Sequence, residues 1–158
     1  MMIQDIGITT LVENTASAPE LLAEHGLSFW IEYEDKRILF DTGQSDILIQ
    51  NAKALGVNLA EADAIILSHG HYDHVGGLAA VLDIAAKAKV YLHPAAIEPK
   101  FIRKPSGAQS IGMPDPAKKA LRGRDVVWTE TPVEKFRSAF PEQCFACSAG
   151  TRIHLKEM

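Results

Sequence analysis

The sequence predicts an α/β fold, in which short strands alternate with helices along the chain. Residues 64–67 form a short apolar run with two isoleucines, which is typical of a buried strand. Residues 78–88 are rich in alanine and leucine, and their apolar positions recur at helical spacing. The stretch 68–77 between them holds three histidines. It lies where a strand ends and a helix begins, which is the usual place for a site in an α/β fold.

The first part of the chain is expected to form strands, a polar turn and two helices. β-branched and aromatic residues favour strands, and the expected strands are residues 3–12, 27–33 and 36–40. Pro19 suits the first turn of a short helix over residues 20–24, and His25 beyond it is expected to be a helix-end or surface residue. Ser45 or Asp46 is expected to cap a second helix that runs to about residue 55.

The later part of the chain continues the alternation and then loses it. The expected elements are a strand over 90–92, an exposed loop or loose hairpin over 98–113, a helix over 117–121 and a strand over 125–129. From residue 133 onward the sequence shows neither the helical nor the strand period. Cys144 and Cys147 lie in this tail and are expected to be free thiols, because a single C-x-x-C is a weak metal or redox signal.

Length, composition and charge restrict the class of protein. At 158 residues the chain suits one domain, and 47% hydrophobic with 23% charged residues is ordinary for a globular protein. A net charge of −4 does not favour nucleic acid or an anionic membrane as partner. No signal-like start and no apolar run long enough to span a membrane is present, so a cytoplasmic location is expected.

The histidine stretch has the composition of a metal site. His69, His71, Asp73 and His74 place three imidazoles and one carboxylate within six residues. Imidazole nitrogens and carboxylate oxygens are ligands for zinc and similar divalent ions. If the segment is extended, alternate side chains point one way, and His74 could serve a second ion in a two-metal site. A solvent-exposed polar loop would account for a single histidine, but it does not account for a cluster of three histidines and one aspartate.

Two residues outside the cluster are candidates for supporting it. Asp41 ends the strand 36–40 and is followed by Thr42 and Gly43. We expect its carboxylate to support the metal ligands, with a turn-fixing hydrogen bond as a compatible role. Asp-Thr-Gly also suggests an aspartic-protease half-site, but the alternation of strands and helices contradicts that fold. His93, at the end of the strand 90–92, is a weak candidate ligand.

These motifs resemble a known superfamily. His69-x-His71-x-Asp73-His74, followed by Val-Gly-Gly, resembles the signature of the metallo-β-lactamase fold superfamily, and residues 38–43 resemble the strand-end aspartate that precedes it. Residues 24–29 and 55–57 are similar to the branch of dihydropterin ribofuranosyl-aminobenzene phosphate synthases. The resemblance implies an αββα sandwich, of which residues 1–132 are expected to be the N-terminal part and 133–158 an atypical tail.

The resemblance also implies an activity and a cofactor. Members are metal-dependent hydrolases, so we expect a divalent metal, zinc in one or two ions, with manganese or iron as alternatives. Asp73 would hold metal and orient the nucleophile that attacks an ester, amide or phosphoester of a small-molecule substrate. The family takes further ligands from its second half, and no matching strand end follows Trp128. A catalytically silent metal-binding domain and the pterin-related synthase branch therefore stay open, as does a homodimer that covers an apolar sheet face.

Overall fold

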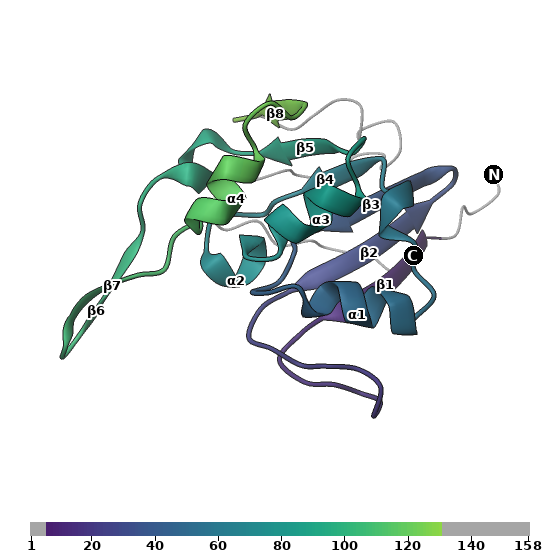
Figure 1. The fold of residues 1–158 in the computed structure, drawn as a ribbon, viewed down its shortest axis with the longest axis horizontal. Coiled ribbons are helices and arrows are strands. Elements are labelled where there is room, and N and C mark those ends of the chain that lie inside the picture. Colours follow the sequence, from purple (N-terminus) through teal and green to yellow (C-terminus); the bar gives the residue numbers. More distant parts are fainter. Residues whose placement is uncertain (1–5, 131–158) are drawn as a thin grey trace, which may run out of the picture.

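The computed structural model describes residues 6–130 of the chain (Figure 1). The strands are β1 (Ile6–Val12), β2 (Ser28–Tyr33), β3 (Lys36–Phe40), β4 (Ala64–Ile66), β5 (Lys89–Leu92), β6 (Phe101–Lys104), β7 (Gly107–Ser110) and β8 (Val126–Trp128). The helices are α1 (Ile47–Ala54), α2 (Tyr72–Val75), α3 (Leu78–Ile84) and α4 (Asp115–Ala120), with 3₁₀ turns η1 (Leu59–Glu61) and η2 (Pro94–Ile97). The expected tail 133–158, with its cysteines, lies outside the described residues.

The six-stranded sheet has the order β1-β2-β3-β4-β5-β8. The first three strands pair antiparallel as a meander, whereas β3, β4, β5 and β8 run parallel. Each parallel connection carries a helix, as the alternation in the sequence predicts. Because parallel strands end at the same edge of a sheet, the residues that follow β3, β4 and β5 are brought together there. This edge holds both the Asp-Thr-Gly turn and the histidine stretch.

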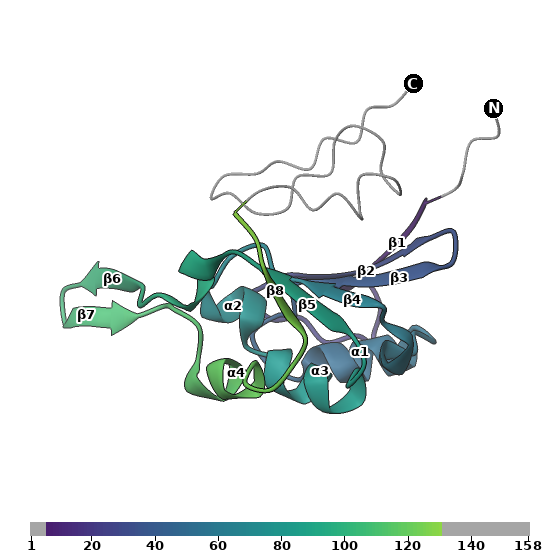
Figure 2. The ribbon, with the colours of Figure 1, turned by 90° about the horizontal axis from the view of Figure 1, so that it is seen from above.

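One face of the sheet is covered by helices. Figure 2 shows α1, α3 and α4 on the same side of the six strands. The main core lies between these layers, and Leu39, Ile65 and Val90 from the central strands are buried in it. Alternate residues of the same strands point to the opposite face, where Ile38, Ile66 and Tyr91 form a second apolar cluster. Within residues 6–130 no helix lies on that opposite face. The mixed α/β architecture and one helix layer of the expected sandwich are confirmed.

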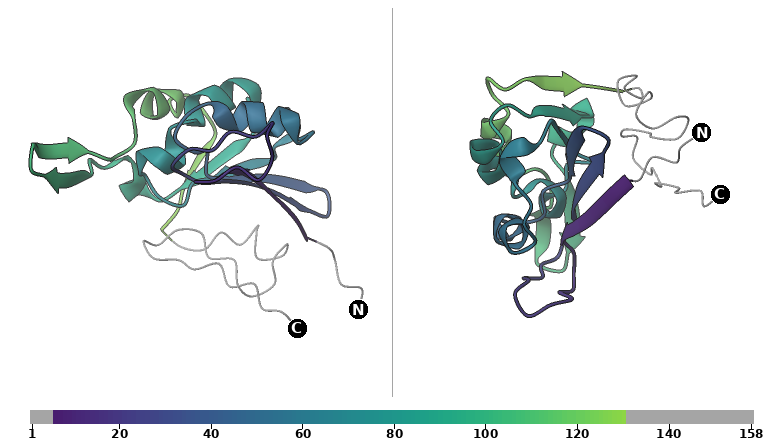
Figure 3. Two further views of the ribbon diagram at one scale, coloured as in Figure 1. Left: turned by 90° about the horizontal axis from the view of Figure 1, so that it is seen from below. Right: turned by 90° about the vertical axis from the view of Figure 1, so that its right-hand side faces the viewer.

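The β6–β7 hairpin extends away from this body (Figure 3). Its two strands pair only with each other, and all eight of their residues are exposed. The expectation of an exposed loose hairpin is confirmed. The hairpin is attached near the histidine stretch, because the backbone N–H of Tyr72 donates to the carbonyl of Ile111 at 3.1 Å.

The short helix expected over residues 20–24 is wrong. The segment makes one turn, in which the N–H of Leu21 donates to the carbonyl of Ala18, and then runs irregularly. Five residues are too few to offset the cost of helix nucleation without packing. Here the backbone of Leu22 is instead held by the buried side chain of Asn51 in α1.

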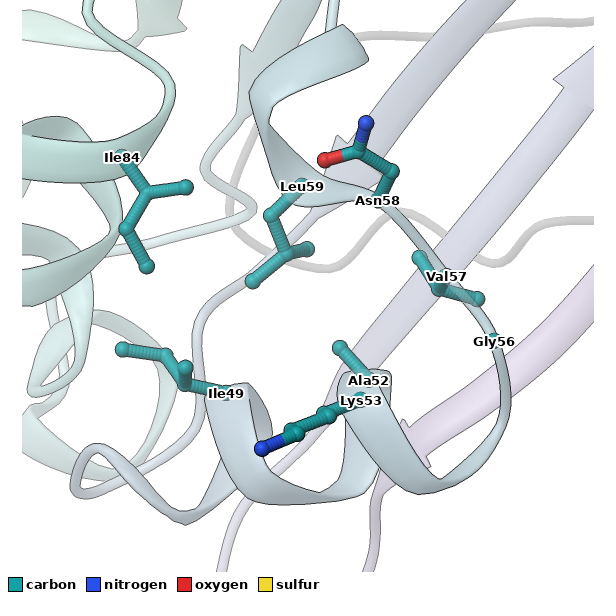
Figure 4. Close-up of a pocket in the computed structure, with 8 residues that line it drawn as sticks. All are labelled: Ile49, Ala52, Lys53, Gly56, Val57, Asn58, Leu59 and Ile84. Carbon is teal, nitrogen blue, oxygen red and sulfur yellow. The ribbon is translucent and has the colours of Figure 1, made fainter.

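A shallow apolar hollow lies on the helix side of the sheet, between α1, η1 and α3 (Figure 4). Its lining is Ile49, Ala52, Lys53, Gly56, Val57, Asn58, Leu59 and Ile84. These residues include no histidine, carboxylate or thiol, so the hollow lacks the groups that metal or acid–base chemistry requires. None of the helices among residues 6–130 is sufficiently long and apolar for a membrane span.

The close approach of the histidine stretch to η2 gives a test of the fold. A methyl group on Gly70 would overlap the carbonyl oxygen of Ala96 and lie 2.8 Å from its Cα. We expect Gly70→Ala to lower the free energy of unfolding by about 1–3 kcal/mol, because the backbone of η2 must shift. Urea unfolding in the presence of a chelator measures this without any contribution from metal.

The matched control is Gly7→Ala in β1. There the added methyl group meets only Glu32, at distances of 3.7 Å or more, and the glycine has no left-handed backbone. We expect a change within about 0.5 kcal/mol for the control. Equal stabilities of the two variants would contradict the packing described here.

Candidate metal centre

Asp41 joins the ends of two strands. It follows β3 directly, is fully buried and has a left-handed backbone with φ of 56°, a conformation that aspartate tolerates better than most residues. Its N–H donates to the carbonyl of Ile66 at the end of β4, over 2.9 Å. Its own carbonyl accepts the hydroxyl of Ser28, also at 2.9 Å. These bonds fix the direction in which the carboxylate points.

The carboxylate of Asp41 accepts three hydrogen bonds from the histidine stretch. Ser68 donates its backbone N–H to Oδ1 at 2.7 Å and its hydroxyl to Oδ2 at 2.6 Å. His74 donates from Nδ1 to Oδ2 at 2.7 Å. A single buried carboxylate thus holds both the beginning of the stretch and the helix α2 that ends it.

These contacts determine which nitrogen of two histidines can bind a metal. Because a carboxylate only accepts, the proton of the His74–Asp41 bond lies on Nδ1 of His74. The Ser68 hydroxyl gives its proton to Asp41, so its oxygen accepts Nδ1–H of His69 at 2.9 Å. In the neutral form of both rings the lone pair is therefore on Nε2. A histidine held at one nitrogen and free at the other is the usual arrangement of a metal ligand.

The electrostatics of the two rings differ. Burial lowers the pKa of His69, and repulsion from His74 and His71 lowers it further. Burial also disfavours the charged form of His74, but the hydrogen bond and charge of Asp41, with a contribution from Asp73, outweigh it and raise the pKa of His74. His69 is thus the ring that stays neutral more readily.

The structure brings His69, His71, Asp73 and His74 together. The ring centroids of His69 lie 4.4 Å from His71 and 4.2 Å from His74. The expected extended conformation holds for His71, but α2 begins at Tyr72, so Asp73 and His74 lie on one helical turn. The helix forms here because N–H groups of His74 and Val75 both donate to the carbonyl of His71.

The donor types fit a divalent ion, and one pair also fits in distance. Nε2 of His74 lies 3.6 Å from Oδ2 of Asp73. Two ligand atoms of a tetrahedral zinc site, each about 2.0–2.1 Å from the ion, lie about 3.4 Å apart. Among residues 6–130, however, no three His, Cys, Asp or Glu side chains are arranged to hold one ion. The described residues thus form no complete set of ligands for one ion.

His93 lies at the end of β5 and serves a local purpose. Its Nδ1 accepts the N–H of Ala95 at 3.1 Å and so caps η2. In the described part of the chain it forms no ion pair or ring contact with the other histidines. The structure thus gives His93 a structural role at this edge of the sheet.

Two contacts at the site were not predicted from the sequence. Ser68 connects Asp41 to His69, and its position between a buried strand and the first histidine was the available signal. His25 lies against Asp73, with 3.3 Å between Nε2 and Oδ2. No sequence pattern relates these two residues, because they are 48 positions apart.

Replacing the central carboxylate tests this network. Asp41→Asn keeps the size and the tolerance for a left-handed backbone but places an N–H₂ group against the donors of Ser68 and His74. We expect the free energy of unfolding to fall by about 1–3 kcal/mol, because buried donors lose their acceptor. Chemical denaturation of the metal-free chain measures it, with Asp46→Asn as control because Asp46 is exposed and caps α1 without a side-chain bond. Identical stability of the Asp41→Asn variant and the wild type would contradict the network.

The chain is similar to several known proteins. Residues 22–140 match the family model of the metallo-beta-lactamase superfamily. An uncharacterized protein of Methanocaldococcus jannaschii is 40% identical over 115 residues, which cover 72% of this chain and 43% of the relative. The 7,8-dihydropterin-6-methyl-4-(beta-D-ribofuranosyl)-aminobenzene-5'-phosphate synthase of the same organism is 39% identical over 111 residues, 65% of this chain and 37% of the synthase.

A solved structure is similar as well. The crystal structure of Tm1679, a metal-dependent hydrolase of the beta-lactamase superfamily, superposes with a TM-score of 0.58 at 28% identity, over 77% of this chain and 41% of that one. The chain therefore spans less than half the length of these relatives. Members of this superfamily generally bind divalent metal ions. The strand-end aspartate, the histidine stretch and the matched family model together show that the chain belongs to the metallo-beta-lactamase superfamily.

Proposed function

We propose that the chain is the N-terminal part of a metal-dependent hydrolase. His69, His71, Asp73 and His74 would bind one or two divalent ions, zinc first, with manganese or iron as alternatives for this mixed ligand set. The observation that carries the proposal is the orientation of two rings: Asp41 and Ser68 hold Nδ1 of His74 and His69, which leaves Nε2 of each as the metal-binding nitrogen. A polar loop in solvent would not need a buried hydrogen-bond network of this kind.

The chemistry follows from the ligands. A divalent ion bound here would supply a hydroxide nucleophile near neutral pH, since coordination lowers the pKa of water to about 7. The chain itself contributes orientation: Asp41 fixes the His74 ring, and Asp73 would orient the nucleophile. The substrate would be a small molecule with an ester, amide or phosphoester bond, because hydroxide cleaves these bonds by attack at carbon or phosphorus.

The coordination shell is completed outside the described residues in this proposal. A catalytic zinc ion usually takes three protein ligands, whereas the cluster offers His69 with His71 and Asp73 with His74. The relatives are more than twice as long as the parts matched here. We propose that the further ligands come from a second half of the complete protein and strengthen metal binding there.

A pterin-related synthase is the second candidate function. The observation that favours it is the 39% identity to the Methanocaldococcus jannaschii synthase, over 65% of this chain. Such an enzyme condenses two substrates rather than cleaving one. The same metal ligands could serve either reaction, so the substrate decides between them.

Metal binding and turnover test the main proposal. We expect purified chain to retain divalent metal, measured per chain by inductively coupled plasma mass spectrometry. His71→Ala and His74→Ala should each lower that content and abolish any hydrolysis while the circular dichroism spectrum stays native. Lys87→Ala, at an exposed position in the loop after α3, is the matched control and should retain both. Full metal content and activity in either histidine variant would refute the assignment of ligands.

A substrate panel separates the two candidate functions. A hydrolase should cleave phosphodiesters, thioesters or amides, and release of the leaving group measures this hydrolysis. A pterin phosphate offered together with an aminobenzene ribosyl phosphate should be condensed only by a synthase. Condensation without hydrolysis of any panel member would replace the first proposal by the second.

A further inference from the structure

We propose that His25, which lies outside the histidine motif, is a positioning residue for Asp73. The inference deepens the proposed function and rests on it, because Asp73 is one of the proposed metal ligands. His25 belongs to the loop between β1 and β2, far from the motif in sequence. In the structure its Nε2 lies 3.3 Å from Oδ2 of Asp73.

The ring of His25 is held at its other nitrogen. Its Nδ1 lies 3.1 Å from Oδ1 of Asn14, and the N–H of Gly26 donates to the same oxygen at 3.4 Å. The Asn14 side chain thus holds one end of the ring, and the other end faces Asp73. The imidazole is 67% exposed, so its orientation depends on these two contacts.

The loop backbone also packs directly on Asp73. The N–H of Leu27 donates to the carbonyl of Asp73 at 3.4 Å. Gly26 has a φ of 146°, and a Cβ at this position would overlap that same carbonyl oxygen. Only glycine allows both the backbone conformation and the close approach. The loop and the first turn of α2 therefore have a fixed spacing at this point.

The carboxylate of Glu24 holds the loop in place. The carboxylate of Glu24 accepts the N–H of Gln44 at 2.8 Å, the N–H of Ser45 at 3.0 Å and the hydroxyl of Ser45 at 2.6 Å. These residues follow the Asp41 turn and lead into α1. His25 is thus carried by a segment that is tied to the same framework as the metal ligands.

The consequence is that Asp73 lies between two imidazoles. Oδ2 faces Nε2 of His25 on one side and Nε2 of His74 on the other, at 3.3 and 3.6 Å. The Asp73 side chain is only 13% exposed, whereas the His25 side chain is 67% exposed. His25 would hold Oδ2 at the spacing that lets Asp73 and His74 share an ion.

The test compares His25→Ala with His25→Gln in the full chain. Zinc affinity is measured by competition with a chromophoric chelator, and the visible spectrum of bound Co²⁺ reports the ligand arrangement. We expect His25→Ala to weaken affinity about tenfold, as for other residues that orient ligands, and to change the Co²⁺ spectrum. His25→Gln should restore both, because its amide N–H₂ can donate to Asp73 but cannot replace an imidazole ligand.

The controls separate this role from folding and from direct ligation. Glu20→Ala changes an exposed residue of the same loop and should leave affinity unchanged. Affinity in His25→Ala equal to wild type would overturn the proposal, and so would a loss that His25→Gln does not restore. Absence of metal binding by the wild-type chain would instead refute the proposed function.

A metal-free experiment tests the contact itself. In a double-mutant cycle, His25→Ala and Asp73→Asn are combined and the unfolding equilibrium constants are measured in chelator. We expect His25→Ala to change this constant about two- to fivefold more in the wild-type background than in the Asp73→Asn background, the size typical of a contact between exposed polar side chains. Equal changes in both backgrounds would overturn the proposal, whether or not the chain binds metal.

Discussion

The hydrogen bonds to the Asp41 carboxylate are the interaction on which the rest of the site depends. They connect the end of β3 to Ser68 at the end of β4 and to His74 on α2. Without this acceptor, neither histidine ring would be held in its orientation. His74 donates to Asp41 directly, and His69 reaches it through the Ser68 hydroxyl. The left-handed backbone of Asp41 is retained because backbone and hydroxyl groups hold it on both sides. The sheet thus serves as the rigid support of the proposed ligands.

Much of the fold could be predicted from local patterns. The strands 28–33 and 36–40, the helix after Asp46 and the exposed hairpin near residues 101–110 each have a clear period or turn signal, and the structure contains all of them. The junction of β4 with the histidine stretch was visible for the same reason, because a buried strand gives way abruptly to polar residues. The superfamily could be identified because its signature lies in this one continuous stretch.

The missed features arise from contacts between distant segments. Residues 20–24 have helical character, but hydrogen bonds to Asn51 and the Glu24 anchor favour an irregular loop. The expected extended conformation of the motif ends at Tyr72, where the carbonyl of His71 begins a helical turn. The approach of His25 to Asp73 depends on how the β1–β2 loop folds back, which no local pattern encodes. Local sequence patterns therefore locate the histidine stretch but not the distant side chains that contact it.

The most direct test of this account follows the ring nitrogens of His74 by long-range ¹H–¹⁵N correlation NMR while Zn²⁺ is added to the chain. We predict that Nδ1 keeps its proton, because it donates to Asp41, and that the resonance of Nε2 shifts to the range of a metal-bound nitrogen. An Nε2 resonance that stays unchanged at saturating Zn²⁺, or coordination through Nδ1, would contradict the claim that Asp41 orients His74 toward a metal ion.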